Sequence, residues 1–315
     1  MRQTTVAQLF DYHRERLPLL LIGGNLDAPI QINPQHTSPA DLVGHLNLIY
    51  PDRIQVVGAP EINWSNQQHA VRVSSHLAEI ITAHPPAVIV ADGCAPPALV
   101  REACEHAGTA LFSTPQPAAV VIDLLRLWLS RQLAETVEMH AVMMDVLGMG
   151  VLITGDSGVG KSELALELIS RGHGLVADDI VEIAHISPDV LEARCPPMLK
   201  DFIEVRGLGV LNIRTIFGET ACRRKMKLKL VVNLLRSHKT AADIDRLPLG
   251  AETQDILGVP VRKVSLPVAA GRNLAVLLEA AVRSTILLLR GIDSTQEFVE
   301  RHKQAMDKDG GVTAD

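Results

Sequence analysis

Aromatic side chains are scarce in this chain: Phe, Trp and Tyr make up only 3% of its 315 residues. Its core must therefore be built mainly from aliphatic residues, and hydrophobic residues do account for 47% of the chain. Charged residues account for 21%, so the composition differs from that of a disordered protein. We expect a globular protein, long enough for two domains that each have a core.

Cysteine is also rare, with four residues, and no two of them have the spacing of a metal site. The N-terminus lacks the basic and then apolar segments of a secretory signal, so we expect free thiols in a reducing cytoplasm. The most apolar stretch, residues 274–289, contains Glu279 and Arg283. A membrane span needs about 20 largely uncharged residues, so this stretch predicts a buried amphipathic helix and no membrane partner.

An excess of positive charge is missing as well. The net charge is −6 and the pI is near 6.1, which argues against a nucleic-acid partner because such proteins carry a basic surface. The one basic run, residues 223–229, alternates Lys with apolar residues in its second half. That period of two predicts a strand with one face in solvent.

Residues 1–130 are predicted to form a small α/β domain with a parallel sheet. Helical periodicity is seen over residues 66–83 and 97–106, and an apolar, helix-like segment at 120–135 connects to a second domain, residues 131–315. Short apolar runs, most of them bounded by Gly, Pro or Asp, have the pattern of buried parallel strands; they span residues 19–22, 54–57, 87–91 and 109–112.

Residues 151–166, VLITGDSGVGKSELAL, fit the phosphate-loop pattern G-x-x-x-x-G-K-[ST] between an apolar strand and a helix-forming run. The loop glycines lack Cβ, so successive N–H groups can face phosphate oxygens at a helix N-terminus. Lys161 would contact the β- and γ-phosphates, and the Ser162 hydroxyl would ligate Mg²⁺. The predicted nucleotide-binding residues are Gly155, Asp156, Ser157, Gly158, Val159, Gly160, Lys161 and Ser162.

An apolar strand at residues 174–177 is followed by two carboxylates, Asp178 and Asp179. Ligands of open α/β sheets bind at the carboxyl ends of strands. One carboxylate could therefore lie near Mg²⁺ and the other could act as a base. The alternative is a surface turn or a helix cap.

A histidine, His140, lies on a predicted strand that reaches Val151 through a turn at residues 148–150. A histidine on a strand is more often structural than catalytic. If the two strands form a hairpin with Leu147 opposite Val151, however, the extended register brings His140 level with Gly158. We therefore expect the imidazole beside the phosphate loop.

Two other polar segments are less informative by themselves. Glu204 precedes a glycine-broken apolar run, and Arg246 lies in the polar segment 243–247. Spacing alone predicts surface loops for both, although an arginine could stabilise phosphate charge in a transition state.

Six motifs in the same order resemble those of the bacterial HPr kinase/phosphorylase family, over residues 135–306. The N-terminal 130 residues resemble that family more weakly. The matching segments are Met139-His140, residues 151–163, Arg171-Gly172-His173 with 175–179, 204–210, Asp245-Arg246 and 268–274.

The resemblance implies a bifunctional enzyme that uses ATP and Mg²⁺ to phosphorylate a serine of HPr, the phosphocarrier protein of the sugar phosphotransferase system. In reverse, inorganic phosphate would remove that group and give pyrophosphate. The resemblance also implies a homohexamer, a role in regulating carbon metabolism, and a C-terminal phosphate-loop kinase domain related to phosphoenolpyruvate carboxykinase.

The family's functional positions can be placed in this sequence. By resemblance, Asp179 is the base, His140 assists it, Lys161 holds phosphate, Arg246 stabilises transferred charge, and Ser162 and Glu204 bind Mg²⁺. One catalytic loop is expected at Ile203, Glu204, Val205, Arg206, Gly207, Leu208, Gly209, Val210, Leu211 and Asn212. The other is expected at Leu266, Pro267, Val268, Ala269, Ala270 and Gly271.

One position departs from the family pattern, where Gly usually follows the strand histidine and this chain has Ala141. The extra methyl group could alter the approach of the backbone or tune the reverse reaction.

Two other functions use the same loop. A small-molecule kinase would need a substrate pocket and no protein-docking surface. The second is a non-catalytic nucleotide switch. A GTPase would need a base-specificity signature such as N-K-x-D, which the sequence lacks. Incubation with HPr and labelled ATP separates these alternatives.

The predicted helix at residues 273–290 is apolar on more than one face. Such a helix must be covered by its own domain or by a neighbouring chain. We therefore expect self-association through the C-terminal half.

Overall fold

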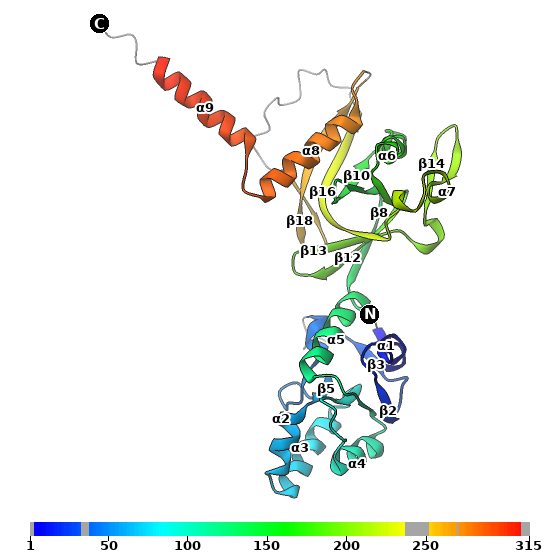
Figure 1. The fold of residues 1–315 in the computed structure, drawn as a ribbon, viewed down its shortest axis with the longest axis vertical. Helices are drawn as coiled ribbons and strands as arrows, with labels where there is room; N and C mark the ends of the chain where they lie inside the picture. Colours follow the sequence, from blue (N-terminus) through cyan, green and yellow to red (C-terminus); the bar gives the residue numbers. More distant parts are fainter. Residues whose placement is uncertain (1–2, 33–37, 237–251, 270, 310–315) are drawn as a thin grey trace. The chain divides into compact units, whose positions relative to one another are not determined.

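The computed structural model describes residues 3–32, 38–236, 252–269 and 271–309 (Figure 1). It divides into two compact units, Met1–Ala134 and Glu135–Asp315. Each unit has hydrophobic clusters of its own. This is a two-domain α/β architecture.

A five-stranded sheet forms the centre of the N-terminal unit, in the order β2-β7-β6-β5-β4. Its strands are β2 (Leu20–Gly23), β4 (Val43–His45), β5 (Ile54–Val57), β6 (Ala87–Val90) and β7 (Ala110–Ser113). The helices of the unit are α1 (Val6–His13), α2 (Ala59–Asn66), α3 (Ala70–Thr82), α4 (Ala98–Ala107) and α5 (Ala118–Gln132), together with the 3-10 turn η1 (Pro39–Leu42). A separate antiparallel pair joins β1 (Gln3–Thr5) to β3 (Pro29–Gln31).

Successive residues of the central strands face opposite layers, as the side-chain period of two requires. On β6, Ile89 packs with side chains of α1 and α5, whereas Val88 and Val90 pack with those of α3 and α4. Burial on both faces explains why these strands read as continuous apolar runs.

The expectation that all four apolar runs are parallel strands was wrong for the first. Strands β4, β5, β6 and β7 pair in parallel, but β2 pairs antiparallel with β7. Leu20 on β2 is 62% exposed, because β2 lies at the edge of the sheet.

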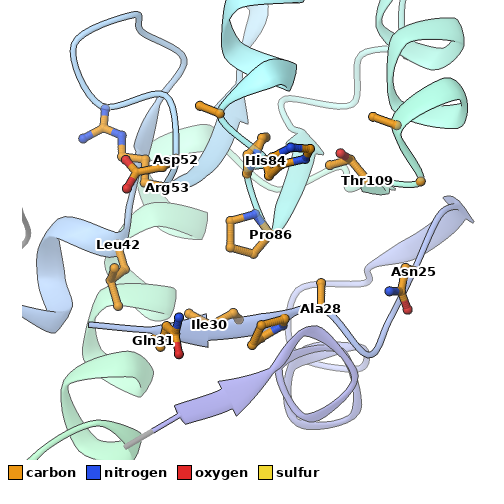
Figure 2. Close-up of a pocket in the computed structure, with 15 residues that line it drawn as sticks. Asn25, Ala28, Ile30, Gln31, Leu42, Asp52, Arg53, His84, Pro86 and Thr109 are labelled. Carbon is orange, nitrogen blue, oxygen red and sulfur yellow. The ribbon is translucent and has the colours of Figure 1, made fainter. Parts of the chain in front are cut away.

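A cavity of about 490 Å³ opens in the N-terminal unit beside the segments that precede β5, β6 and β7 (Figure 2). Its apolar side includes Ile30, Leu42 and Pro86, and its polar residues include His84. The guanidinium group of Arg53, which also borders the cavity, donates to the carbonyl of His45 over 2.7 Å. The cavity and the loop at residues 155–160 belong to different units.

The C-terminal unit contains a nine-stranded sheet with the path β11-β9-β10-β16-β13-β12-β8, to which β18 adds beside β16 and β17 adds beside β18. Its strands are β8 (Glu135–His140), β9 (Val142–Val146), β10 (Met149–Gly155), β11 (Gly174–Ala177), β12 (Ile180–Ser187), β13 (Val190–Arg194), β16 (Lys225–Arg236), β17 (Thr253–Ile256) and β18 (Val259–Val268). The antiparallel hairpin β14 (Phe202–Val205) and β15 (Gly209–Asn212) is separate from this sheet.

Helices α6 (Lys161–Ser170) and α8 (Leu274–Leu289) share one apolar cluster with β9, β10 and β16. The buried residues of α8 are Ala275, Leu278, Val282 and Thr285, so the prediction of a buried amphipathic helix is confirmed. The remaining elements are α7 (Ile213–Phe217), α9 (Ser294–Asp309) and the short turns η2 (Pro197–Leu199) and η3 (Glu219–Ala221). Among the described residues, no helix combines the length and apolar character that a membrane crossing requires.

Most of the basic run, from Lys225 onward, forms the start of β16. Its lysines at 225, 227 and 229 are exposed, whereas Leu228 and Leu230 are buried. The prediction of a strand with one solvated face is confirmed.

Candidate active site

The glycine-rich loop, residues 155–160, connects β10 to α6. Gly155, Gly158 and Gly160 all have positive φ angles, of 140°, 70° and 102°. Positive φ favours glycine because a side chain would clash with the backbone. At Gly155 a Cβ atom would also lie 2.6 Å from the carbonyl oxygen of Leu234. The conformation of the loop therefore depends on glycine.

Lys161 begins α6 and is 7% exposed. Its Nζ donates to the carbonyl oxygens of Gly155 and Asp156, over 3.0 and 3.2 Å. The ammonium group is thus held inside the curl of the loop, at the positive end of the helix. An anion in this position would meet both the lysine charge and the helix N-terminus.

The two adjacent carboxylates have different surroundings. Asp178 is 4% exposed, accepts from the Ser162 hydroxyl over 3.0 Å, and accepts from the backbone N–H of Glu204 over 2.9 Å. Burial raises the pKa of Asp178 above its usual range, and these hydrogen bonds oppose the shift. Asp178 therefore connects α6 with β14.

Asp179 points the other way and is half exposed. Its Oδ1 lies 2.8 Å from Nδ1 of His140. The φ angle of Asp179 is 68°, a left-handed conformation that aspartate tolerates better than most residues. Strand β8 pairs with β12 so that His140 is opposite Ile180, the residue after Asp179, and this pairing brings the two side chains together.

These groups surround a pocket of about 210 Å³. It is lined by His140, Ser157, Gly158, Gly160, Lys161, Ser162, Glu163, Asp178, Asp179, Glu204 and Arg206. Most of the chemically active side chains expected from the sequence therefore lie around one cavity. Val159, by contrast, is 5% exposed and packs in the core.

The two expected catalytic loops differ in their relation to the pocket. The first coincides with the β14–β15 hairpin and contributes Glu204 and Arg206. The second includes the end of β18, where Val268 pairs with Arg236, and none of its described residues lines the pocket. Arg246 and Ala270 lie outside the described residues.

The expected hairpin forms, but its predicted register was wrong. Val151 is opposite Met144, and the turn consists of Leu147 and Gly148. Their φ angles of 54° and 81° are those of a tight two-residue turn, which shortens the connection. His140 reaches the pocket by a different route, because it ends β8 and is not part of β9.

Three residues at or near the pocket have no individual role in the sequence-based prediction: Asp178, which was paired with Asp179, and Glu163 and Arg236. Arg236 ends β16, and its Nη2 donates to the carbonyl of Ser157 over 2.8 Å. No motif marks that residue in the sequence. Its proximity to the loop results from the parallel pairing of β10 with β16.

Ala141 is fully buried and belongs to the apolar cluster with Met143 and Leu152. Its N–H donates to the carbonyl of Asp179 over 3.2 Å. The methyl group thus fits inside the core while the backbone contact to Asp179 is kept.

Comparison with known proteins identifies a family that matches this chain. The HPr Serine kinase C-terminal domain matches residues 131–302, and the HPr Serine kinase N terminus matches residues 4–129. A protein named HPr kinase/phosphorylase from Aromatoleum aromaticum is 63% identical over 311 residues, which cover 99% of each chain.

Proteins of the same name in Azoarcus sp. and Bordetella petrii are 62% and 55% identical, over 98% and 96% of this chain and 99% and 98% of theirs. A solved structure, the Hpr(Ser) kinase/phosphatase from Coxiella burnetii, is 35% identical over 51% of this chain and 98% of that one, with a TM-score of 0.46. The chain belongs to the HPr serine kinase family, whose members are enzymes named for a kinase and a phosphorylase activity.

Proposed function

We propose that this chain uses ATP to phosphorylate a serine of the phosphocarrier protein HPr, and that it also removes this phosphate with inorganic phosphate, which yields pyrophosphate. Membership of the family supports both directions. The contact between His140 and Asp179, on the wall of the pocket that contains Lys161, is the observation that carries the chemistry.

The glycine-rich loop is proposed to be a phosphate loop. Its three positive-φ glycines, the ammonium of Lys161 and the N-terminus of α6 together provide donors and positive charge for a triphosphate or pyrophosphate. The same features support the proposed kinship of the C-terminal domain with phosphoenolpyruvate carboxykinase.

Mg²⁺ fits the oxygen donors at one end of the pocket. Ser162 and Asp178 are hydrogen-bonded to each other, and Glu204 contacts Asp178 through its backbone. In the described part of the chain, no three His, Cys, Asp or Glu side chains gather as a metal cage. Mg²⁺ commonly takes few protein ligands and completes its octahedron with phosphate oxygens and water. When bound, it would neutralise charge on the phosphates.

Asp179 is the proposed base. In the forward direction its carboxylate takes the proton of the serine hydroxyl as the serine oxygen bonds to the γ-phosphorus and the bond to ADP breaks. In reverse, a phosphate oxygen bonds to the phosphorus of phosphoserine, and the protonated Asp179 returns its proton to the departing serine oxygen. His140 orients this carboxylate.

Further assignments follow from the family. Arg246 is proposed to stabilise the transferred phosphoryl charge, and residues 203–212 and 266–271 to act as the two catalytic loops. The assembly is proposed to be a homohexamer. Exposed apolar residues in the C-terminal unit, such as Leu289 at 69% and Phe298 at 54%, support self-association.

The deciding experiment incubates the purified chain with HPr, Mg²⁺ and γ-labelled ATP. Transfer of label to a serine of HPr, and release of pyrophosphate when phosphate is added to the product, are the expected results. Transfer only to a metabolite would indicate a small-molecule kinase, and slow hydrolysis alone would indicate a nucleotide switch.

A further inference from the structure

Two arginines from distant parts of the chain converge on the glycine-rich loop. Arg206 lies in the turn of the β14–β15 hairpin, and Arg236 ends β16. A Cβ atom built on Gly158 would lie 3.3 Å from Nη2 of Arg236 and 3.7 Å from Nη1 of Arg206. Both guanidinium groups are therefore within 4 Å of one point at the rim of the pocket.

Neither cation is neutralised within the described ranges. Arg236 donates to the carbonyl of Ser157, an uncharged acceptor, and Arg206 has no hydrogen-bond or ion-pair partner there. Of the four carboxylates that line the pocket, Asp178 is hydrogen-bonded to Ser162 and to the backbone of Glu204, and Asp179 is paired with His140. Within the described part of the chain, the carboxylates of Glu163 and Glu204 form no ion pair with either arginine. Two like charges that approach one point without a shared carboxylate repel each other unless an anion lies between them.

The geometry suits a phosphate group. Each guanidinium has five N–H donors in a planar fork, and Arg236 uses one of them on Ser157. A phosphate offers several oxygen acceptors, so it can accept from two arginines at once.

We propose that Arg206 and Arg236 form an anion site over Gly158 that binds a phosphate group, and this rests on the proposed function only in placing phosphates in the glycine-rich loop. The group is either the terminal phosphate of a bound nucleotide or free inorganic phosphate. Both sources present the same chemistry to the arginines, and they are separable by binding measurements that need no HPr.

The test is calorimetric titration of the full chain with Mg²⁺ and three probes: a non-hydrolysable ATP analogue, ADP and inorganic phosphate. The variants are Arg206→Met, Arg236→Met and Arg236→Lys. Arg224→Met is the matched control, because Arg224 is an exposed arginine just before β16. Arg206→Met removes no described contact, so it should fold normally even if Arg236→Met does not.

If the site holds the terminal phosphate of a nucleotide, Arg206→Met and Arg236→Met each lower the affinity for the ATP analogue roughly 10-fold or more and leave the affinity for ADP unchanged. If the site holds free inorganic phosphate, the same two variants lower only the affinity for inorganic phosphate, again roughly 10-fold or more. In either case Arg236→Lys lies between the wild type and Arg236→Met, and Arg224→Met matches the wild type.

Unchanged affinity for all three probes would overturn the proposal. Equal weakening of ADP and the ATP analogue would also overturn it, because Arg236 would then only hold the shape of the loop. Failure of the wild type to phosphorylate HPr, combined with arginine-dependent binding, would remove the proposed function and leave this site intact.

Discussion

Nδ1 of His140 lies 2.8 Å from Oδ1 of Asp179, across the pairing of β8 with β12. The contact uses one of the two carboxylate oxygens of Asp179. An imidazole that holds a carboxylate in this way orients it and is a common support for a general base. The two roles can be separated by mutation.

Asp179→Asn keeps the size of the side chain and removes its basic oxygen. We expect ATP affinity to remain close to that of the wild type and transfer to HPr to fall by roughly 10²-fold or more, the usual scale of general-base catalysis. The rate of the reverse reaction should fall as well, because in the proposed mechanism the same carboxyl group protonates the serine oxygen.

The measurement is ATP affinity together with both transfer rates. Weak ATP binding with normal turnover at saturating ATP would make Asp179 a metal or structural residue, and His140 would become the first candidate for the base.

Lys161→Ala should abolish both activities and weaken nucleotide binding, because in the proposed mechanism each direction places a highly charged phosphate in the loop. Lys161 is buried and bonded to two loop carbonyls, so thermal unfolding of the variant should be recorded alongside its activity. Near-normal rates in both directions would refute the phosphate-loop assignment.

Glu279 on α8 links this helix to the end of α6. It accepts two hydrogen bonds from Arg171, over 2.8 and 2.7 Å, and lies 2.9 Å from Nε2 of the buried His173. Hydrogen bonds from Arg171 and His173 lower the pKa of Glu279 to about 2. The stabilisation is therefore present above the ordinary glutamate pKa near 4.5 and is lost as the pH falls toward 2.

Glu279→Gln should lower the free energy of unfolding of the C-terminal unit by roughly 1–3 kcal/mol at pH 7. The difference from the wild type should shrink between pH 4.5 and pH 2. Urea unfolding followed by circular dichroism measures this, with the exposed Glu138→Gln as control. A difference that does not change with pH would contradict the assignment.

His13 on α1 is 1% exposed, and neither of its ring nitrogens has a hydrogen-bond partner among the described residues. Burial lowers the pKa of His13 from 6.5 to about 4, and the nearby charge of Arg16 contributes to this shift. In the unfolded chain His13 is protonated below about pH 6.5, whereas in the folded unit it is protonated only near pH 4. The free energy of unfolding therefore falls as the pH is lowered from 6.5 to 4.

His13→Leu should remove this acid sensitivity, which amounts to roughly 2–3 kcal/mol at pH 4. Both tryptophans, Trp64 and Trp128, lie in the N-terminal unit, so tryptophan fluorescence reports on its unfolding. Identical pH profiles for the variant and the wild type would show that His13 is protonated or solvated in the folded protein.

Sedimentation should show that the chain is larger than a monomer at micromolar concentration. Val276 and Leu289 on α8 are 47% and 69% exposed. Changing both to Lys should shift the distribution toward smaller species, because a charged side chain resists burial at an interface. Val71→Lys, at a position 83% exposed on α3, is the control. Sedimentation of the wild type as a monomer at that concentration would contradict the prediction of self-association.

Several features were readable from the sequence because they depend on neighbouring residues. The strands at residues 54–57 and 87–90 are bounded by turn residues and alternate between two apolar layers, so their positions were predicted to within a residue. The prediction that the edge strand β2 is parallel to its neighbour was wrong, because an apolar run does not determine whether a strand pairs in parallel or antiparallel.

What the sequence by itself determined is the glycine-rich loop and the family. Strand, loop and helix are contiguous there, and glycine is required by local backbone angles. Tertiary structure alone decided which aspartate faces Ser162 and which faces His140, and it brought Arg236 to Ser157. These contacts depend on strand register and on turn length, and a change of one residue in register would turn each side chain to the opposite face of its sheet.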